Sequence, residues 1–473
     1  MTSASTLPTH PALPRSLTLR LREHMTLYGY ELANAPMLER AELFLSRAGD
    51  QILHRLFTFE RYGIQLALRP EFTTPALHRY MQEPGDGNVA RWQFSGQIFE
   101  DDPASNRLDY ERLSIGAELI GLGTDAAARL GADAEIIAMA AHGAHAAGVD
   151  NVRVVIGDVQ LTRKLIASFE LDPRTQNFLL RHVDALSDPA LGKAYVLDQY
   201  DAFLIADGSL VSASDAVNPA ESGQIQTILN SLLDATERGV TMGGRSQQDI
   251  SRRLLRKYRH AAQRDQIVQV LDVLADWIQM GGAYAQALAS MRSFAPLVER
   301  GSDQINGLAA LVDTLEHYGV DVQDIELQPG LIRDWDYYTG IVFELYTGGA
   351  QHHIAGGGRY DELARLIGAD REIPAVGFVY YVDALQTAIS DLGDEGVRVF
   401  TLCSPQIETI EAVQWAQALR ERAIAVRLLP STAMATDAGD LTLTPSGALH
   451  YDDTDYAPEQ ADLLAAALKR ASQ

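Results

Sequence analysis

The sequence predicts an α+β fold in which helices flank an antiparallel sheet. Segments typical of strands gather near both ends of a unit that covers residues 14–390, and a mainly helical, polar stretch at about 161–320 separates them. Strands grouped in this way favour an antiparallel sheet over a doubly wound fold, in which strands and helices alternate. After a break at 391–396 (DLGDEG), a further strand and helix predict a small C-terminal α/β domain over 391–473.

The first half of the larger unit combines helices with pairs of strands. Helical spacing of apolar residues predicts three helices, which span 16–28, about 38–47 and about 132–147. Alternating or short apolar runs predict strands, which span 29–37 with a break at Pro36, 56–68, 91–99, 112–120 and 152–159. The pair Tyr62-Gly63 predicts the turn of a hairpin within 56–68.

Strands return in the second half of the larger unit. The runs GIVFELY (340–346) and AVGFVYY (375–381) predict two strands with a glycine-rich turn between them. In the C-terminal domain, VRVFTL (397–402) predicts a strand and ETIEAVQWAQALRERA (408–423) predicts a helix.

The charge of the chain bears on its partners. The sequence has 63 Asp and Glu against 39 Lys and Arg, a formal net charge of −24. Nucleic-acid binding depends largely on a basic surface that displaces counterions from phosphates, so this charge argues against a nucleic-acid partner, although a local basic patch stays possible. The one locally basic cluster, 251–264, is most simply one face of an exposed helix, with a docking patch as the alternative.

Composition also excludes several classes of site. Cys403 is the only cysteine, which rules out an internal disulfide framework and a cysteine-rich metal site, and no other metal site or cofactor is expected. No run of eighteen uncharged apolar residues is present, so we expect no membrane span. Residues 1–13 are polar and broken by proline, which predicts a loose N-terminal arm instead of a secretory signal and favours a cytoplasmic protein.

Two segments carry carboxylates that suit a ligand amine. In LRPEFTT (68–74), Glu71 and the hydroxyl of Thr73 can both accept hydrogen bonds from an ammonium group, although a solvated loop explains the segment equally well. Glu118 stands between apolar neighbours in the strand 112–120. A carboxylate placed there needs a cationic partner, which is either a protein side chain or a ligand amine.

Two further segments suit a planar ligand. Arg333, Tyr337 and Tyr338 precede a plain apolar strand, where aromatic rings can stack on a planar ring or simply pack the core. Gly356 and Gly357 open a glycine triplet that lets the backbone approach a ligand closely, although tight turns also need glycine. The triplet lacks the pattern of a phosphate-binding loop.

Taken together and in this order, these segments resemble the class II histidyl-tRNA synthetases. LRPEFTT resembles that family's LRPEgT segment, and RWQFSGQIFEDDPA (91–104) with GAE (116–118) resembles motif 2. RDWDYYTGIVFE (333–344) and AGGGRYDEL (355–363) resemble its two histidine-specific signatures. PAVGFVYYVDAL (374–385) resembles motif 3, and YGYELANAPMLE (28–39) with the helix before it resembles motif 1, the dimer segment. The resemblance covers roughly residues 14–390 and implies the same core fold.

The departures from the family pattern lie where the family binds ATP. Its motif 2 has a phenylalanine-arginine pair where this chain has Phe99-Glu100. Its motif 3 ends Gly-(Ile/Leu)-Glu-Arg-Leu, whereas this chain reads Tyr381-Val382-Asp383-Ala384-Leu385, so Ala384 replaces the arginine. Those arginines neutralise phosphate charge in the family, so their loss predicts that adenylation is abolished and that the chain has no catalytic residues of its own. Tyr110 and Ser114 replace two further motif 2 residues.

The amino-acid pocket of the family is retained. By resemblance, Glu71, Thr73 and Glu118 hold the α-amino group of histidine. Tyr337 and Tyr338 match the imidazole pocket. The resemblance also gives a glycine-rich wall, at Gly356 and Gly357, and an arginine near the carboxylate, Arg333. A kept pocket without the phosphate clamp predicts histidine binding without turnover.

One group of paralogues of the synthetases fits this pattern, namely the regulatory subunits of ATP phosphoribosyltransferase. The resemblance implies a homodimer that assembles with a short-form catalytic subunit in the first step of histidine biosynthesis, with L-histidine as feedback ligand. The tail from Asp391 has six cations against thirteen acids, so it resembles a degenerate anticodon-binding domain. The alternatives are a divergent active histidine–tRNA ligase and a synthetase-like protein with an unrelated binding role.

Overall fold

The computed structural model describes residues 15–45, 55–82, 89–101, 110–122, 125–188, 190–206, 264–298, 300–333, 335, 337–348, 352–389, 400–403, 410–429 and 441–471. The chain divides into two compact units, one containing residues 17–390 and one containing residues 391–473.

A nine-stranded sheet forms the centre of the larger unit. Its strand order is β1-β5-β6-β12-β11-β10-β7-β9-β8. The strands span Glu31–Leu32 (β1), Ala90–Phe99 (β5), Glu111–Ile120 (β6), Ala375–Tyr381 (β12), His352–Arg359 (β11), Ile341–Thr347 (β10), Arg153–Asp158 (β7), Ile325–Leu327 (β9) and Gly282–Ala283 (β8). All neighbours are antiparallel except the pairs β1–β5 and β7–β9. The predicted antiparallel sheet is therefore confirmed, with a parallel pair toward each edge.

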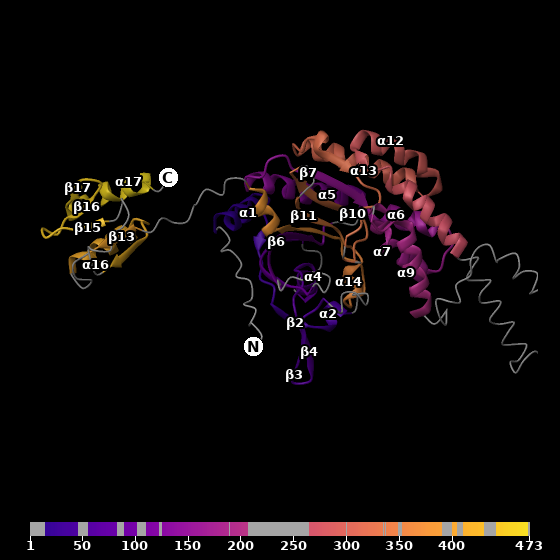
Figure 1. Ribbon diagram of the computed structural model, residues 1–473, viewed down its shortest axis with the longest axis horizontal. Helices are drawn as coiled ribbons and strands as arrows, with labels where there is room; N and C mark the ends of the chain where they lie inside the picture. Colours follow the sequence, from indigo (N-terminus) through magenta and orange to yellow (C-terminus); the bar gives the residue numbers. More distant parts are fainter. Residues whose placement is uncertain are drawn as a thin grey trace, which may run out of the picture. The chain divides into compact units, whose positions relative to one another are not determined.

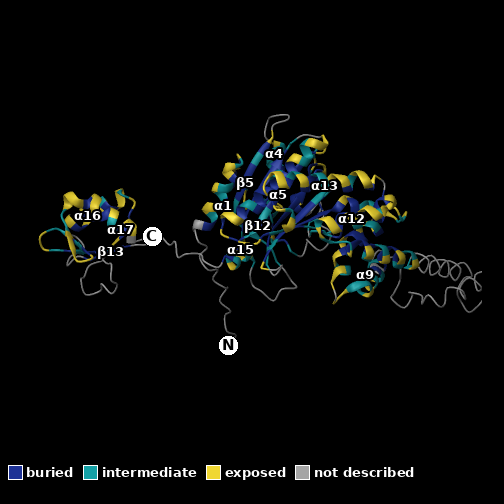
Figure 2. Cartoon of the chain, turned by 90° about the horizontal axis from the view of Figure 1, so that it is seen from above, coloured by how far each residue is buried: buried dark blue, intermediate teal, exposed yellow. Residues whose placement is uncertain are grey.

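Helices cover the sheet (Figure 1). The helix α5 (Ala126–Ala146) packs on β12, β10, β11 and β6, and α13 (Gly301–His317) packs on α5. Asp125 begins α5 by accepting a hydrogen bond from the amide of Ala128 at 2.9 Å. The central strands are largely buried, whereas helices such as α12 (Tyr284–Phe294) keep an exposed face (Figure 2). The prediction of helices flanking a sheet is thus confirmed.

The N-terminal part of this unit carries a second, three-stranded sheet. Its order is β2-β4-β3, with β2 at Leu38–Arg40, β3 at Thr58–Arg61 and β4 at Ile64–Leu68. The β3–β4 hairpin projects from the unit (Figure 1), and its turn residues Tyr62 and Gly63 have φ of 53° and 74°, as the sequence predicted for a tight hairpin. The helix α2 (Glu42–Leu45) packs on β2, and α4 (Thr73–Gln82), which follows β4 in the sequence, packs on α2 and on β6 of the larger sheet.

Two predictions in this part were wrong. The helix expected from Leu38 begins only at Glu42, because residues 38–40 pair with β4 as a strand. The strand expected at 29–37 is reduced to β1, because the carbonyls of Ala35 and Met37 accept hydrogen bonds from Arg69 instead of from a neighbouring strand. Residues 38–40 have helical spacing of apolar side chains, but they form a strand because β4, some 26 to 30 residues further along the chain, pairs with them.

The stretch between the two groups of strands is mainly helical, as predicted. Besides α12 and α13, its described helices are α6 (Val159–Ala167), α7 (Pro173–Arg181), α8 (Val183–Ser187), α9 (Gly192–Ala206) and a helical segment at 264–278, with short 3-10 turns at Ala295–Leu297 and Val322–Asp324. The basic cluster lies outside the described residues except for Arg264, which pairs with Asp201 at 3.4 Å. Two short helices, α14 (Leu363–Leu366) and α15 (Val382–Ala388), flank β12 in sequence.

The smaller unit contains a five-stranded sheet of order β14-β13-β15-β16-β17. Its elements are β13 (Phe400–Cys403), α16 (Ile410–Glu421), β14 (Val426–Leu429), β15 (Leu441–Leu443), β16 (Leu449–Tyr451), β17 (Thr454–Tyr456), a 3-10 turn (Pro458–Gln460) and α17 (Ala461–Ala471). The predicted α/β domain is confirmed, with a core in which Trp415 and Leu468 join the strands. None of the described helices in either unit combines the length and apolar character needed to cross a membrane.

The glycine triplet predicted as a turn lies instead in β11, a central strand. Gly357 pairs with Phe343 of β10 and with Phe378 of β12, so both neighbours are hydrogen-bonded strands. Because successive residues of a strand face opposite sides, Gly356 and Gly358 face away from α5 and Arg359 faces toward it.

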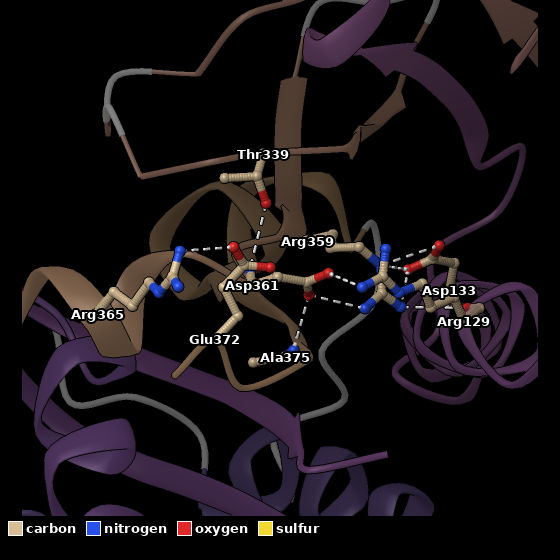
Figure 3. Close-up of polar contacts among 8 residues, drawn as sticks. All are labelled: Arg129, Asp133, Thr339, Arg359, Asp361, Arg365, Glu372 and Ala375. Carbon is tan, nitrogen blue, oxygen red and sulfur yellow. Dashed lines mark hydrogen bonds and ion pairs between the residues drawn. The ribbon is translucent and has the colours of Figure 1, made fainter. Parts of the chain in front are cut away.

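A buried ion-pair network joins β11 to α5 (Figure 3). Arg359 donates from Nε to Asp133 at 3.0 Å, and from Nη1 to Asp361 at 3.0 Å. Asp361 in turn accepts from the amide of Ala375, at the start of β12, at 3.0 Å. Burial raises the pKa of Asp133 to about 6, although Arg359 opposes this shift. Among the described residues, Arg359 is the only cation paired with Asp133, whereas Asp361 also pairs with Arg129 at 3.4 Å.

We expect Arg359→Ala to lower the free energy of unfolding by about 3–5 kcal/mol, because it leaves the buried carboxylate of Asp133 without its cation and that of Asp361 with Arg129 alone. Urea unfolding of the full chain measures this loss. Arg365→Ala is the matched control, since the Arg365–Glu372 pair at 3.2 Å is exposed and should contribute below about 1 kcal/mol. Equal losses for the two variants would contradict a structural role for the network.

Candidate functional site

A cavity of about 1010 Å³ lies on the face of the sheet opposite α5. Its floor is nearly bare of side chains, because Gly116 (β6), Gly377 (β12) and Gly356 (β11) occupy neighbouring strands on this face. A Cβ at Gly356 would collide with the guanidinium of Arg333, and one at Gly377 would collide with the carboxylate of Glu118. The glycines therefore let these two charged side chains lie flat on the sheet.

One end of the cavity is acidic. Glu118 is buried and accepts hydrogen bonds from the hydroxyls of Thr73 at 2.6 Å and Tyr360 at 2.5 Å. Glu71 accepts from the amide of Thr74 at 3.0 Å and so caps the start of α4. Among the residues that the structure describes, neither carboxylate forms an ion pair with a cation.

This missing cation has an electrostatic consequence. Burial raises the pKa of Glu118 to about 8, although the hydroxyls of Thr73 and Tyr360 oppose the shift, and the neighbouring Glu71 raises it further. Burial also raises the pKa of Glu71. A ligand ammonium placed between the two groups would supply the positive charge that this end of the cavity lacks.

A buried arginine stands across the floor from this acidic end. Arg333 donates to Glu344 Oε1 at 2.9 Å and to the hydroxyl of Tyr381 at 2.6 Å, and its guanidinium lies 5.9 Å from the ring centroid of Tyr338. Burial lowers its pKa, but Tyr381, Tyr338 and Glu344 more than offset this effect, so the pKa is raised overall. Glu344 is shared with His353, whose Nε2 lies 3.5 Å from the same oxygen.

Two residues predicted for the pocket wall do not line the cavity. The ring of Tyr337 packs between Trp335, at 5.8 Å, and Tyr360, also at 5.8 Å, behind the acidic end. Gly357 lies on the α5 side of β11, where a Cβ would meet the backbone of Gly377 and Phe378. Glu71, Thr73, Glu118, Arg333, Tyr338 and Gly356 do line the cavity.

The positions that differ from the synthetase pattern line the same cavity at its other end. Glu100 forms ion pairs with Arg55 at 2.6 Å and with Arg112, so two guanidiniums surround its carboxylate. Ala384, in α15, contributes only a methyl group. Glu100 is thus neutralised within the protein, and the local charge of the three side chains is positive.

Sequence reasoning missed several residues of the cavity. Glu344 and Tyr346 alternate with buried residues along β10, and this period of two could have placed both on the cavity face. Tyr381 stands in the motif 3 segment where the synthetase pattern has glycine, which was a visible signal. Tyr360 is 242 residues from its partner Glu118, and no local pattern marks that pairing.

A family model described as histidyl-tRNA synthetase matches residues 4–206 and 227–385 of the chain. The chain belongs to the histidyl-tRNA synthetase family. Within it, the chain is a paralogue of the synthetases and is similar to the group named ATP phosphoribosyltransferase regulatory subunit.

Relatives of that name are similar over nearly their whole length. The subunit from Brucella anthropi is 30% identical over 387 residues, which cover 78% of this chain and 96% of the relative. The subunit from Sinorhizobium medicae is 31% identical over 366 residues, which cover 75% and 92%.

Solved structures of the histidyl-tRNA synthetase family share the fold. A structure titled as an ATP phosphoribosyltransferase regulatory subunit/histidyl-tRNA synthetase from Bacillus halodurans has a TM-score of 0.61 at 20% identity and covers 92% of this chain and 95% of that one. A histidyl-tRNA synthetase from Nostoc has a TM-score of 0.62 at 16% identity and covers 100% and 99%. The predicted class II synthetase-like architecture is confirmed by these likenesses.

The protonation of Glu118 should be visible in the stability of the protein. Its pKa is about 8 when folded and ordinarily 4.5, so the folded state keeps a proton that the unfolded state loses between these values. Glu118 therefore makes the wild type lose stability as the pH rises from about 4.5 to 8, and Glu118→Gln lacks this part of the pH dependence. We expect the difference in unfolding free energy between variant and wild type to grow by a few kcal/mol in favour of glutamine over this range.

Urea unfolding at pH 4.5, 6.5 and 8.5 checks this expectation. Glu60→Gln, at an exposed position of β3, is the control and should give a difference that stays constant with pH. A constant difference for Glu118→Gln as well would show that Glu118 is ionised throughout, contrary to the expectation.

Proposed function

We propose that this chain is the non-catalytic regulatory subunit of ATP phosphoribosyltransferase, and that it senses L-histidine in the first step of histidine biosynthesis. The observation that carries the proposal is the pairing of two features in one cavity. The acidic end retains Glu71 and Glu118 without a protein cation, while the opposite end has Glu100 and Ala384 where synthetases have arginines. The names and coverage of the relatives point the same way.

Histidine fits the cavity in one orientation. The α-amino group lies between Glu71 and Glu118, where it replaces the proton on Glu118 as the source of positive charge. The imidazole packs beside Tyr338, and the carboxylate faces Arg333. Tyr337 supports the pocket from behind, and the floor at Gly356 leaves room for the ligand.

Adenylation is absent from this proposal. A glutamate at position 100, already paired with Arg55 and Arg112, offers no open guanidinium pair to an α-phosphate, and Ala384 offers no charge at all. Preorganised cations at those positions stabilise the charge that develops in acyl and phosphoryl transfer. A chain without these cations binds the amino acid but does not form the adenylate.

Regulation requires assembly with other chains. We propose a homodimer built on α1 (Arg15–Leu27) and β1, the motif 1 elements, within a complex with a short-form catalytic subunit. A two-fold dimer presents every docking surface twice, which favours a symmetric hetero-oligomer. Nucleic acid and membranes have no part in this function, and we place it in the cytoplasm.

The alternative function is that of a divergent but active histidine–tRNA ligase. The positive local charge of Arg55, Glu100 and Arg112 is the one observation in its favour. The alternative requires histidine-dependent exchange of pyrophosphate into ATP. We expect none above background for the purified chain, and exchange at a rate that scales with chain concentration would establish the ligase instead.

The proposed function is tested by co-expression with a short catalytic subunit. We expect one co-eluting species, whose phosphoribosyl transfer responds to histidine only when this chain is present. Glu118→Ala should still co-elute, but about a hundredfold more histidine should be needed for the same response, because a buried carboxylate–ammonium pair contributes a few kcal/mol. Steady-state turnover against histidine concentration gives the result.

Two comparisons make this test decisive. Glu60→Ala, on the exposed hairpin, is the control and should leave the histidine response unchanged. If the catalytic subunit alone is equally active and equally inhibited by histidine, the proposed function is wrong. If the wild-type complex responds and Glu118→Ala responds at the same concentration, the regulatory role stands and the pocket is misplaced.

A further inference from the structure

The cavity is larger than a free amino acid requires. At about 1010 Å³ it lies at the upper limit of the roughly 300–1,000 Å³ typical of pockets for drug-sized ligands. Its two ends differ in chemistry, with Glu71 and Glu118 at one and the trio Arg55, Glu100 and Arg112 at the other. A histidine held at the acidic end would leave the second end unfilled.

Strand register places Tyr381 between these two ends. Along β12, the cavity-facing positions are 377, 379 and 381, and their partners on β6 are Glu118, Gly116 and Ser114. Arg112 lies two residues beyond Ser114, about 7 Å further along the strand at the usual rise. Along this face from Gly377 toward Arg112, Tyr381 is thus the first aromatic side chain of β12 that comes after the glycines.

The ring of Tyr381 is fixed from two sides. Its hydroxyl accepts a hydrogen bond from Nη2 of Arg333 at 2.6 Å. Its edge packs on His353, with ring centroids 4.8 Å apart at 68°, and His353 stacks on Tyr346 at 5.0 Å and 21°. Three rings anchored on three neighbouring strands, with a buried arginine among them, form a wall and not a mobile side chain.

We propose that Tyr381 is the specificity-determining residue of the pocket, a wall that admits a free amino acid and rejects one extended at its carboxyl group. This inference rests on the proposed function, since it takes histidine to bind at the acidic end. The carboxylate of such a histidine points at Arg333, and therefore at the ring that Arg333 holds. Any group attached to that carboxyl must pass through the space of Tyr381. The synthetase pattern has glycine at this position, which leaves the passage open.

The wall also explains why Arg333 is held so firmly. Of its described contacts, one joins it to Glu344 on β10 and one to Tyr381 on β12, so it bridges the two strands on either side of β11. Gly356 of β11 lies beneath the guanidinium, where a side chain would collide with it. The arginine and the wall therefore hold each other in place.

Two ligands that carry an uncharged amide in place of the carboxylate isolate the size of the extension from its charge. L-histidinamide and L-histidine benzylamide both lack the carboxylate, so they differ only in the bulk beyond the carbonyl. We expect calorimetry on the full chain to show that the wild type prefers histidinamide by at least about tenfold. Tyr381→Gly should reduce that preference to within about threefold, because it removes the ring from the path.

Three variants serve as controls. Tyr381→Phe keeps the ring and should keep the preference, so it separates the wall from the hydroxyl. Val379→Gly makes the same change to glycine on the same strand and face, but on the near side of the wall, and should keep the preference too. If Tyr381→Gly does not fold, Tyr381→Ala takes its place.

The outcomes are distinct. Equal affinity of the wild type for the two amides, or an undiminished preference in the folded Tyr381→Gly or Tyr381→Ala variant, would overturn the inference. If neither amide binds the wild type, the gain of benzylamide binding by Tyr381→Gly supports it and the lack of gain overturns it. Failure of the wild type to bind L-histidine itself, alone or with the catalytic subunit, would overturn the proposed function and this inference together.

Discussion

The structure depends on the way β11 is held between two faces of different character. On one side Arg359 is buried against Asp133 and Asp361, and on the other side Gly356 lines a cavity without a side chain of its own. The ion pairs fix the side on which each residue lies, because a slip of one residue along the strand would bring the arginine into the cavity and the glycines onto α5. Because β10 and β12 pair with β11, the position of β11 also determines which of their residues face the cavity.

The charges around the cavity are balanced unevenly. At the Arg333 side, Glu344 and the hydroxyl of Tyr381 accept hydrogen bonds from the guanidinium. At the acidic side, the carboxylates of Glu71 and Glu118 receive hydroxyl and amide donors but no cation from the residues that the structure describes. Burial of a carboxylate without a cation is costly, and the raised pKa of both groups expresses that cost. A ligand that supplies a cation would remove this unfavourable free energy of burial on binding, so the cost in the free protein would favour the bound state.

The sequence predicted those parts of the fold that local patterns encode. The helix near 16–28, the hairpin at Tyr62-Gly63 and the strand pair β5–β6 were all recognised, because periodicity and turn residues lie within a few positions of one another. β11 was taken for a turn, since a glycine triplet has the same local pattern in a turn and in a central strand. Only the strand order β12-β11-β10 tells them apart, and strand order arises from pairings distant in sequence.

The residues of the cavity also divide into those that the sequence predicted and those that it did not. Glu71, Thr73, Glu118 and Arg333 were identified by resemblance, and all four line it. What resemblance left out are contacts between residues distant in sequence, such as Arg359 with Asp133, which are 226 residues apart, and Glu100 with its two arginines. A reversal of charge at position 100 predicts a repulsive site when it is considered alone. In the fold, Arg55 and Arg112 neutralise that glutamate, so the carboxylate is paired within the protein and one positive charge remains at the end of the cavity that differs from the synthetases.

The two ends of the cavity differ in the free energy that a ligand can gain, and this difference explains how a synthetase-like core could bind an amino acid without a reaction. Where internal ion pairs satisfy a site, a ligand must break them, and its net gain is small. Where buried carboxylates have no cation, a ligand ammonium forms its pairs without such competition. The substitution at Glu100 therefore does more than remove a phosphate contact, since it adds a partner for Arg55 and Arg112, and the substitution at Tyr381 adds a partner for Arg333. The free energy available to a ligand is concentrated at Glu71 and Glu118, which is the arrangement that a sensor of a small amine-bearing molecule requires.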